Sequence, residues 1–140
     1  MAAEFYVTLR IYSDNWTPEQ LSSIIGINSE WSRLKGAPKR PGVSVYIKQN
    51  IWSIDSQISR ARPINEHMDD LLKRISRVID RLKIISEEQG NYIEFGCVLR
   101  SKEEPTLYFT KEQLEMINRI GADIDVDLYY WERTEKDEIA

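Results

Sequence analysis

Three aspartates at alternating positions near the end of the chain are the side chains best suited to chemistry. Asp123, Asp125 and Asp127 are separated by single apolar residues, so a β-strand would place all three carboxylates on one face of a sheet. Such a row resembles the ligands of Mg²⁺ or Ca²⁺, or the paired carboxylates of a hydrolase. However, side chains two residues apart on a strand are separated by about 7 Å, too far for all three to hold one ion. We expect solvated charge, pairing with Arg10 or Lys48, or contact with a basic partner, and keep a metal-dependent hydrolase as a less favoured alternative.

Other reactive side chains are scarce. His67 is the only histidine and Cys97 the only cysteine, which is too few for a typical zinc site. We expect His67 to be a partly exposed helix residue and Cys97 to be buried on the inward face of a strand. The chain contains no P-loop and no glycine-rich dinucleotide turn. We therefore assign no catalytic residue, cofactor or metal ligand, and expect a protein that is not an enzyme.

Residues 64–90 form the strongest helical pattern. Their apolar residues recur at three- and four-residue steps, which predicts one long central helix with a buried face. The opposite face carries the basic residues Lys73, Arg74, Arg77 and Arg81. Aspartates interrupt this basic run, so we expect a solvated surface that is a secondary candidate for partner contact.

Alternating hydrophobicity predicts strands at residues 4–12, 92–99 and 123–131. Residues 43–48 and 51–54 read as the two strands of a hairpin, and residues 107–109 as a very short strand. Residues 27–42 are rich in proline, glycine and basic side chains, which is typical of a loop.

Two further helices begin with nearly the same sequence. Trp16-Thr17-Pro18-Glu19-Gln20-Leu21 and Phe109-Thr110-Lys111-Glu112-Gln113-Leu114 both contain a threonine N-cap with glutamine three residues later, which is a capping box. They indicate either two duplicated ferredoxin-like βα units or two independent uses of the same cap. We expect an α+β fold with one mostly antiparallel sheet and about three helices on one face. Residues 1–131 form a single domain in this interpretation, and residues 132–140 a frayed acidic tail.

A resemblance covers most of the chain, from Tyr6 to Tyr129. The segment Ile120-Gly121-Ala122-Asp123-Ile124-Asp125-Val126-Asp127-Leu128-Tyr129 resembles the C-terminal signature of a mostly bacterial family of unknown function, numbered 4279. Two earlier segments fit the same pattern: Pro18-Glu19-Gln20-Leu21 through Ile25-Gly26-Ile27 followed by Lys35-Gly36, and Trp52-Ser53-Ile54. Asn28 and Ser29 stand where the family often has a proline. The resemblance implies a small α+β domain, and some members look like immunity proteins encoded beside polymorphic toxin genes.

The outward residues of the predicted strands define one open sheet face rich in aromatic and acidic side chains, which favours a protein interface. The candidate partner-binding residues are Tyr6, Arg10, Tyr12, Tyr46, Asp123, Asp125, Asp127, Tyr129 and Trp131.

The net charge and the cysteine content limit which classes of partner and which cellular compartment we expect. The net charge of −4 disfavours nucleic acids and anionic membranes as partners. A single cysteine allows no internal disulfide and indicates a reducing, cytoplasmic compartment. The sequence thus favours a cytoplasmic immunity protein, monomeric or weakly dimeric, that neutralises a basic toxin domain such as a nuclease. The alternative is a small-ligand or regulatory domain with a pocket between the sheet and residues 27–42.

Overall fold

The computed structural model describes residues 2–131, which form one open mixed sheet of five strands. The strands are β1 (Glu4–Ser13), β2 (Trp31–Arg33), β3 (Asn50–Asp55), β4 (Asn91–Ser101) and β5 (Asp123–Tyr130), in the order β2-β3-β1-β4-β5. β1 is central and pairs antiparallel with β3 and β4, whereas β5 pairs parallel with β4 at one edge. The predicted α+β class and mostly antiparallel sheet are confirmed.

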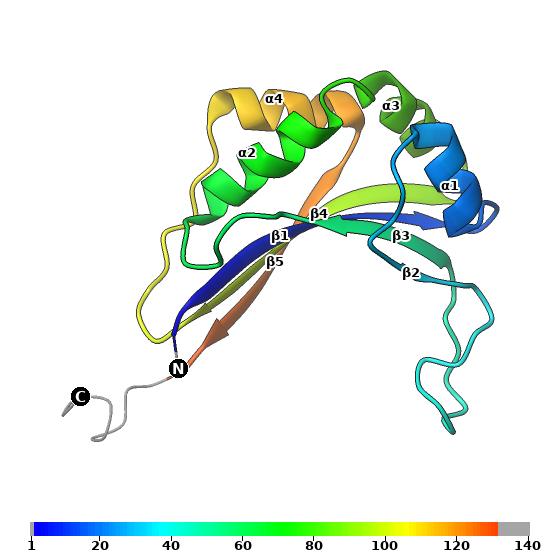
Figure 1. Cartoon of the computed structure of the whole chain (residues 1–140), viewed down its shortest axis with the longest axis horizontal. Coiled ribbons are helices and arrows are strands. Elements are labelled where there is room, and N and C mark those ends of the chain that lie inside the picture. The colour runs from blue at the N-terminus through cyan, green and yellow to red at the C-terminus, as the bar shows by residue number, and fades with distance from the viewer. Residues whose placement is uncertain (1, 132–140) are drawn as a thin grey trace.

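Four helices lie on the same side of this sheet (Figure 1). They are α1 (Pro18–Ile25), α2 (Ile64–Ile75), α3 (Ile79–Glu87) and α4 (Lys111–Ile120). Alternate side chains of the strands meet the apolar faces of the helices, because successive strand residues point to opposite faces. Val7, Leu9 and Ile11 of β1 are fully buried in the resulting core, as are Trp52 of β3 and Phe95 of β4.

Both predicted capping boxes are present. The Thr17 hydroxyl accepts from the Gln20 backbone N–H while the Gln20 side chain accepts from the Thr17 N–H, and Thr110 and Gln113 repeat the arrangement. The connections that follow differ, however. β4 leads through α4 to the parallel strand β5, whereas β1 leads through α1 and β2 to the antiparallel strand β3. The fold therefore does not confirm duplicated βα units.

The prediction of one long helix over residues 64–90 is wrong, because α2 and α3 are separated by a turn. The Ser76 hydroxyl donates to the Lys73 carbonyl at 2.9 Å, and Val78 leaves the helical conformation with φ −120°. The turn lets α2 pack on β1 and α3 pack on β4, so that both apolar faces reach a twisted sheet. It raises the helix count from the expected three to four within the described residues.

The predicted hairpin of residues 43–48 with residues 51–54 is also wrong. β3 pairs instead with β1 and with β2, a strand that the sequence pattern did not predict. Residues 36–47 form a loop folded on itself, in which the Lys39 N–H donates to Val45 and the Ile47 N–H to Ala37. Residues 107–109, predicted as a short strand, lie in an irregular segment leading to α4.

Among residues 2–131, no helix has the length and apolar character needed to cross a membrane. The tail predicted at residues 132–140 lies outside the described residues.

His67 differs from its predicted exposure, because α2 buries it completely. Its Nδ1 lies 2.7 Å from the hydroxyl of Ser56, while its Nε2 is buried with no hydrogen-bond partner among the described residues. Burial lowers the pKa of His67 from its usual 6.5, since a charged imidazole is costly in an apolar site. The only histidine therefore belongs to the packing of α2 against the segment after β3.

This burial makes stability depend on pH. Unfolded His67 binds a proton more readily than folded His67, because its pKa is higher in the unfolded chain. The contribution of His67 to the free energy of unfolding is therefore complete above pH 6.5 and is lost as the pH drops toward the lowered folded-state pKa. We expect His67→Gln to flatten the slope measured by urea unfolding between about pH 5 and 7, where one proton contributes at most about 1.4 kcal/mol per pH unit. Equal slopes for the two proteins would contradict this account.

Candidate functional site

The sheet face opposite the helices, here called the open face, carries most of the candidate residues. Strand register places Arg10 between Ser53 and Glu94, and places Asp125 beside Gly96. Tyr6, Arg10, Tyr12, Asp123, Asp125, Asp127 and Tyr129 all belong to this face by strand alternation.

The centre of the open face is an ion pair. Arg10 Nη1 lies 2.9 Å from Glu94 Oε1, and the Tyr12 hydroxyl donates to the same oxygen at 3.0 Å. The ring of Tyr12 stacks on Tyr92 with their centroids 4.3 Å apart. Burial, and then the neighbouring Glu94 carboxylate, raise the pKa of Tyr12 to about 12. The charges of Arg10 and Glu94 therefore neutralise each other, and Tyr12 helps to position the Glu94 carboxylate.

Gly96 makes room for this pair. A Cβ atom built on Gly96 would lie 2.9 Å from Nη2 of Arg10, closer than real Cβ contacts. Any side chain there would push the Arg10 guanidinium away from Glu94. The absence of a side chain at position 96 is thus part of the site.

The other basic and polar groups of the open face are also engaged. The guanidinium of Arg60 lies 4.2 Å from the ring centroid of Tyr6, and that of Arg100 lies 5.0 Å from the ring centroid of Tyr129. These are distances at which cations are attracted to aromatic faces. The Thr8 hydroxyl donates to Asp55 at 2.6 Å.

Asp123, Asp125 and Asp127 contrast with these engaged groups. None of the three has an ion pair with any other side chain in the described part of the chain. The expected pairing with Arg10 does not form, because β4 separates β1 from β5 and supplies Glu94 instead. Asp123 and Asp125 are exposed and Asp127 is half-buried. The open face therefore ends in a row of carboxylates that lack a partner among residues 2–131.

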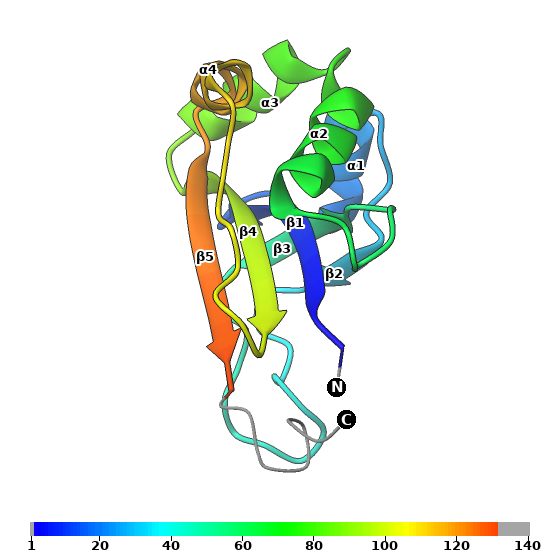
Figure 2. The same ribbon diagram turned by 90° about the vertical axis from the view of Figure 1, so that its left-hand side faces the viewer.

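β5 is poorly covered on its other face too. Figure 1 shows its far end extending beyond the helices, and Figure 2 shows its outer side facing away from the sheet. Ile124 packs against the core, but Val126 is 40% exposed and Leu128 57% exposed. Strand alternation places Val126 and Leu128 on the helix side of the sheet, but alternation cannot show how far α4 reaches along β5.

Two of the candidate residues lie outside the strands. Tyr46 is 55% exposed in the loop between β2 and β3, where it bridges to Pro38, so it is not on the sheet. Trp131 directly follows β5 and is half-buried, with its N–H donating to the Ser101 carbonyl at 3.4 Å. Trp131 thus follows the strand that carries the aspartate row, whereas Tyr46 lies in a loop next to the opposite edge of the sheet.

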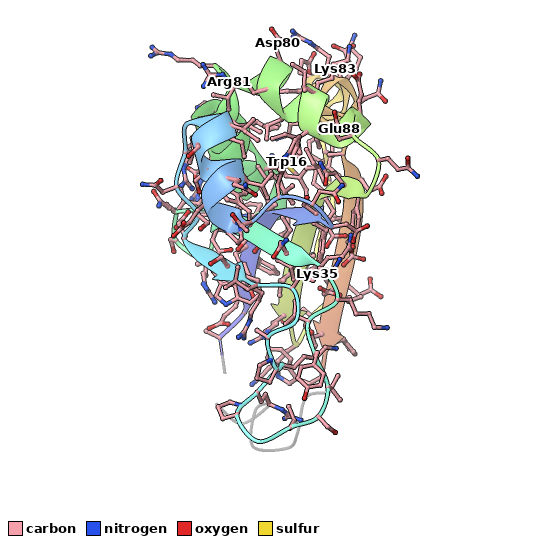
Figure 3. All side chains as sticks on the ribbon, turned by 90° about the vertical axis from the view of Figure 1, so that its right-hand side faces the viewer. Trp16, Lys35, Asp80, Arg81, Lys83 and Glu88 are labelled. Carbon is pink, nitrogen blue, oxygen red and sulfur yellow. The ribbon has the colours of Figure 1, made fainter. Side chains whose placement is uncertain are left out.

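That opposite edge is basic. Residues 31–49 contain five lysines and arginines and no acidic residue, and all five are exposed: Arg33, Lys35, Lys39, Arg40 and Lys48. Figure 3 shows Lys35 near the base of the loop, far from Asp80 and Lys83 on the helices. Lys48 therefore cannot pair with the aspartates of β5, contrary to one of the alternatives drawn from the sequence.

The basic surface of α2 and α3 is the secondary candidate for partner contact. Two of its arginines bind neighbouring segments of the chain. Arg74 binds Glu30 at 2.9 Å and also donates to the Asp55 carbonyl. Arg81 donates to the Ile25 carbonyl at 3.1 Å. The Arg74 contacts connect α2 to the chain beside β2 and β3, and the Arg81 contact connects α3 to the end of α1, so both arginines have a structural role.

The remaining chemical candidates form no reactive cluster. Cys97 is buried as predicted, and burial followed by the charges of Asp125 and Asp127 raises its pKa to about 12. Across residues 2–131, no three His, Cys, Asp or Glu side chains are grouped so that they could hold a metal ion. The hollow closest to the expected ligand pocket has a volume of about 460 Å³ and is lined by Pro18, Glu19, Ser22, Ser23, Asn28, Ser29 and Ser32. Its lining is mostly hydroxyl and amide groups, unlike the largely apolar lining of typical ligand sites.

Together the fold and the open face define a small α+β protein with an aromatic and acidic surface. A family model described as "Domain of unknown function (DUF4279)" matches residues 3–131. The chain therefore belongs to this family, as the sequence resemblance indicated. Searches of curated proteins and of solved structures found no match.

The central ion pair can be tested by removing one of its charges. Arg10 and Glu94 have side chains only 22% and 14% exposed, so Glu94→Gln leaves a poorly solvated guanidinium without a counter-ion. We expect a loss of about 1–3 kcal/mol in the free energy of unfolding, measured by urea denaturation. Asp125→Asn is the matched control on the same face and should change stability by less than about 0.5 kcal/mol. Equal effects of the two substitutions would show that the pair does not support the face.

Proposed function

We propose that this protein is a non-catalytic immunity protein, which binds a cognate bacterial toxin through the open face and β5 and thereby neutralises it in the cytoplasm. The observation that carries the proposal is the separation of charge across this face. The cations Arg10, Arg60 and Arg100 are engaged by Glu94 or aromatic rings, whereas the Asp123–Tyr130 edge presents carboxylates without ion pairs among residues 2–131. A basic protein surface is the complement of such an edge.

Aromatic side chains close to the aspartates supply apolar contact area for a protein partner. Tyr129 and Tyr130 are each more than half exposed, and Trp131 follows them. Large aromatic side chains dominate the energy of many protein interfaces, while charged groups mainly speed and orient the encounter. Exposed aromatic and acidic side chains within a few residues of each other favour a protein partner over a small ligand.

A basic nuclease domain fits the same chemistry. Such an enzyme binds phosphates with lysine and arginine side chains, and an acidic surface seated on that site excludes the nucleic acid. Masking requires no catalytic group on the inhibitor. The family resemblance supports this partner, because some members look like immunity proteins encoded beside toxin genes.

The proposal predicts a charge-sensitive complex with the toxin domain encoded immediately upstream. We expect calorimetric titration to give a nanomolar complex, and Asp125→Lys to weaken it at least about tenfold because it sets like charges against each other. Trp131→Ala should also weaken it, through lost anchor area.

Glu88→Lys is the matched control, since it makes the same charge change at an exposed site among the helices (Figure 3). It should leave the affinity within about twofold. The absence of a complex, or equal losses for Asp125→Lys and Glu88→Lys, would refute binding by the open face.

A further inference from the structure

β5 is an edge strand, so every second backbone N–H and C=O group along it points away from the sheet. The Trp131 N–H donates to Ser101 of β4, and backbone groups alternate in direction along a strand. The N–H groups of Asp125, Asp127 and Tyr129 therefore face β4. Those of Val126 and Leu128 point outward, where no strand of the described chain pairs with them.

The two faces of this edge have different chemistry. Asp123, Asp125 and Asp127 line the open face, while the outward-bonding residues Val126 and Leu128 project their exposed side chains on the helix side. A strand added here would need basic residues opposite the aspartates and apolar residues opposite Val126 and Leu128. Because side chains alternate with period two, such a segment alternates basic and apolar residues.

A second copy of the chain does not meet this requirement. A two-fold axis through an antiparallel β5–β5 pair keeps each copy's open face on the same side, so a register in which the segments 123–127 of the two copies overlap sets aspartate opposite aspartate. Like charges directly opposite one another destabilise a strand pair. The basic loop of a second copy is not a suitable strand either, because residues 36–47 already pair with each other.

We propose that the β5 edge binds an extended segment of a partner protein, with alternating basic and apolar residues, as a sixth strand of the sheet. Backbone hydrogen bonds to Val126 and Leu128 supply affinity, and the aspartate row selects a cationic segment. The identity of that partner as a toxin rests on the proposed function, but the mode of binding is a separate claim. Charged edge residues also keep the free protein from pairing with itself.

A synthetic peptide tests the mode without the toxin. The probe is a fluorescein-labelled peptide of about nine alternating lysine and valine residues, long enough to pair along β5, with a glutamate–valine peptide as control. We expect fluorescence anisotropy to show binding at least about tenfold tighter for the cationic peptide. In the saturated complex, amide hydrogen exchange at Val126 and Leu128 should slow at least about tenfold, because those N–H groups become hydrogen-bonded.

Val126→Pro removes one outward N–H without touching a bond to β4, and proline is tolerated on such an edge. This substitution should weaken binding of the cationic peptide at least about tenfold. Val126→Thr, which keeps the N–H and the branched shape, should weaken binding less than about threefold. Leu128→Pro replaces Val126→Pro if thermal unfolding shows that the first variant is not folded.

The mode is overturned by any of three results: no binding of the cationic peptide up to about 1 mM, equal binding by the proline variant, or unchanged exchange at Val126 and Leu128. Exchange that slows with protein concentration alone would identify a second copy as the occupant and overturn it as well. A toxin complex sensitive to Asp125→Lys but not to Val126→Pro would leave the proposed function standing while strand addition failed.

Discussion

The placement of all four helices on one side of a five-stranded sheet is the constraint on which the rest of the structure depends. It gives the helix side an apolar core and leaves the open face to be stabilised by its own side chains. The Arg10–Glu94 pair meets that need at the centre, where Gly96 makes room for the guanidinium and Tyr12 binds the same carboxylate. A charge pair with little exposure is costly to break, because the remaining group stays poorly solvated.

The same constraint produces the unusual character of β5. The helix layer ends before the strand does, so Val126 and Leu128 emerge on the helix side while the aspartates emerge on the open side. Arg10 is held by Glu94 of β4, and Arg100 lies over the ring of Tyr129, so neither cation pairs with the acidic edge. At the far edge the β2–β3 loop is uniformly basic. The sheet thus separates opposite charges across its width, an arrangement that orients an approaching charged protein.

Features controlled by neighbouring residues were predictable from the sequence. The Thr17 and Thr110 caps depend on a few adjacent side chains, and strand alternation correctly assigned Arg10 and the three aspartates to the open face. Features set by distant contacts were not. The turn after Ile75 follows from how α2 and α3 meet different strands, and the exposure of Val126 depends on where α4 ends. The pairing of Arg10 with Glu94 required the strand order, which no local pattern contains.

In our proposal, the acidic edge strand β5 is the surface that a partner covers. It can be tested by hydrogen exchange followed by mass spectrometry on the full chain, with and without the proposed toxin partner. Slowed exchange should be strongest in the peptide segments covering residues 123–131, with little change in α2 and α3. Slowed exchange confined to α2 and α3, with residues 123–131 unchanged, would contradict it and would make the arginine-bearing helix surface the site of contact.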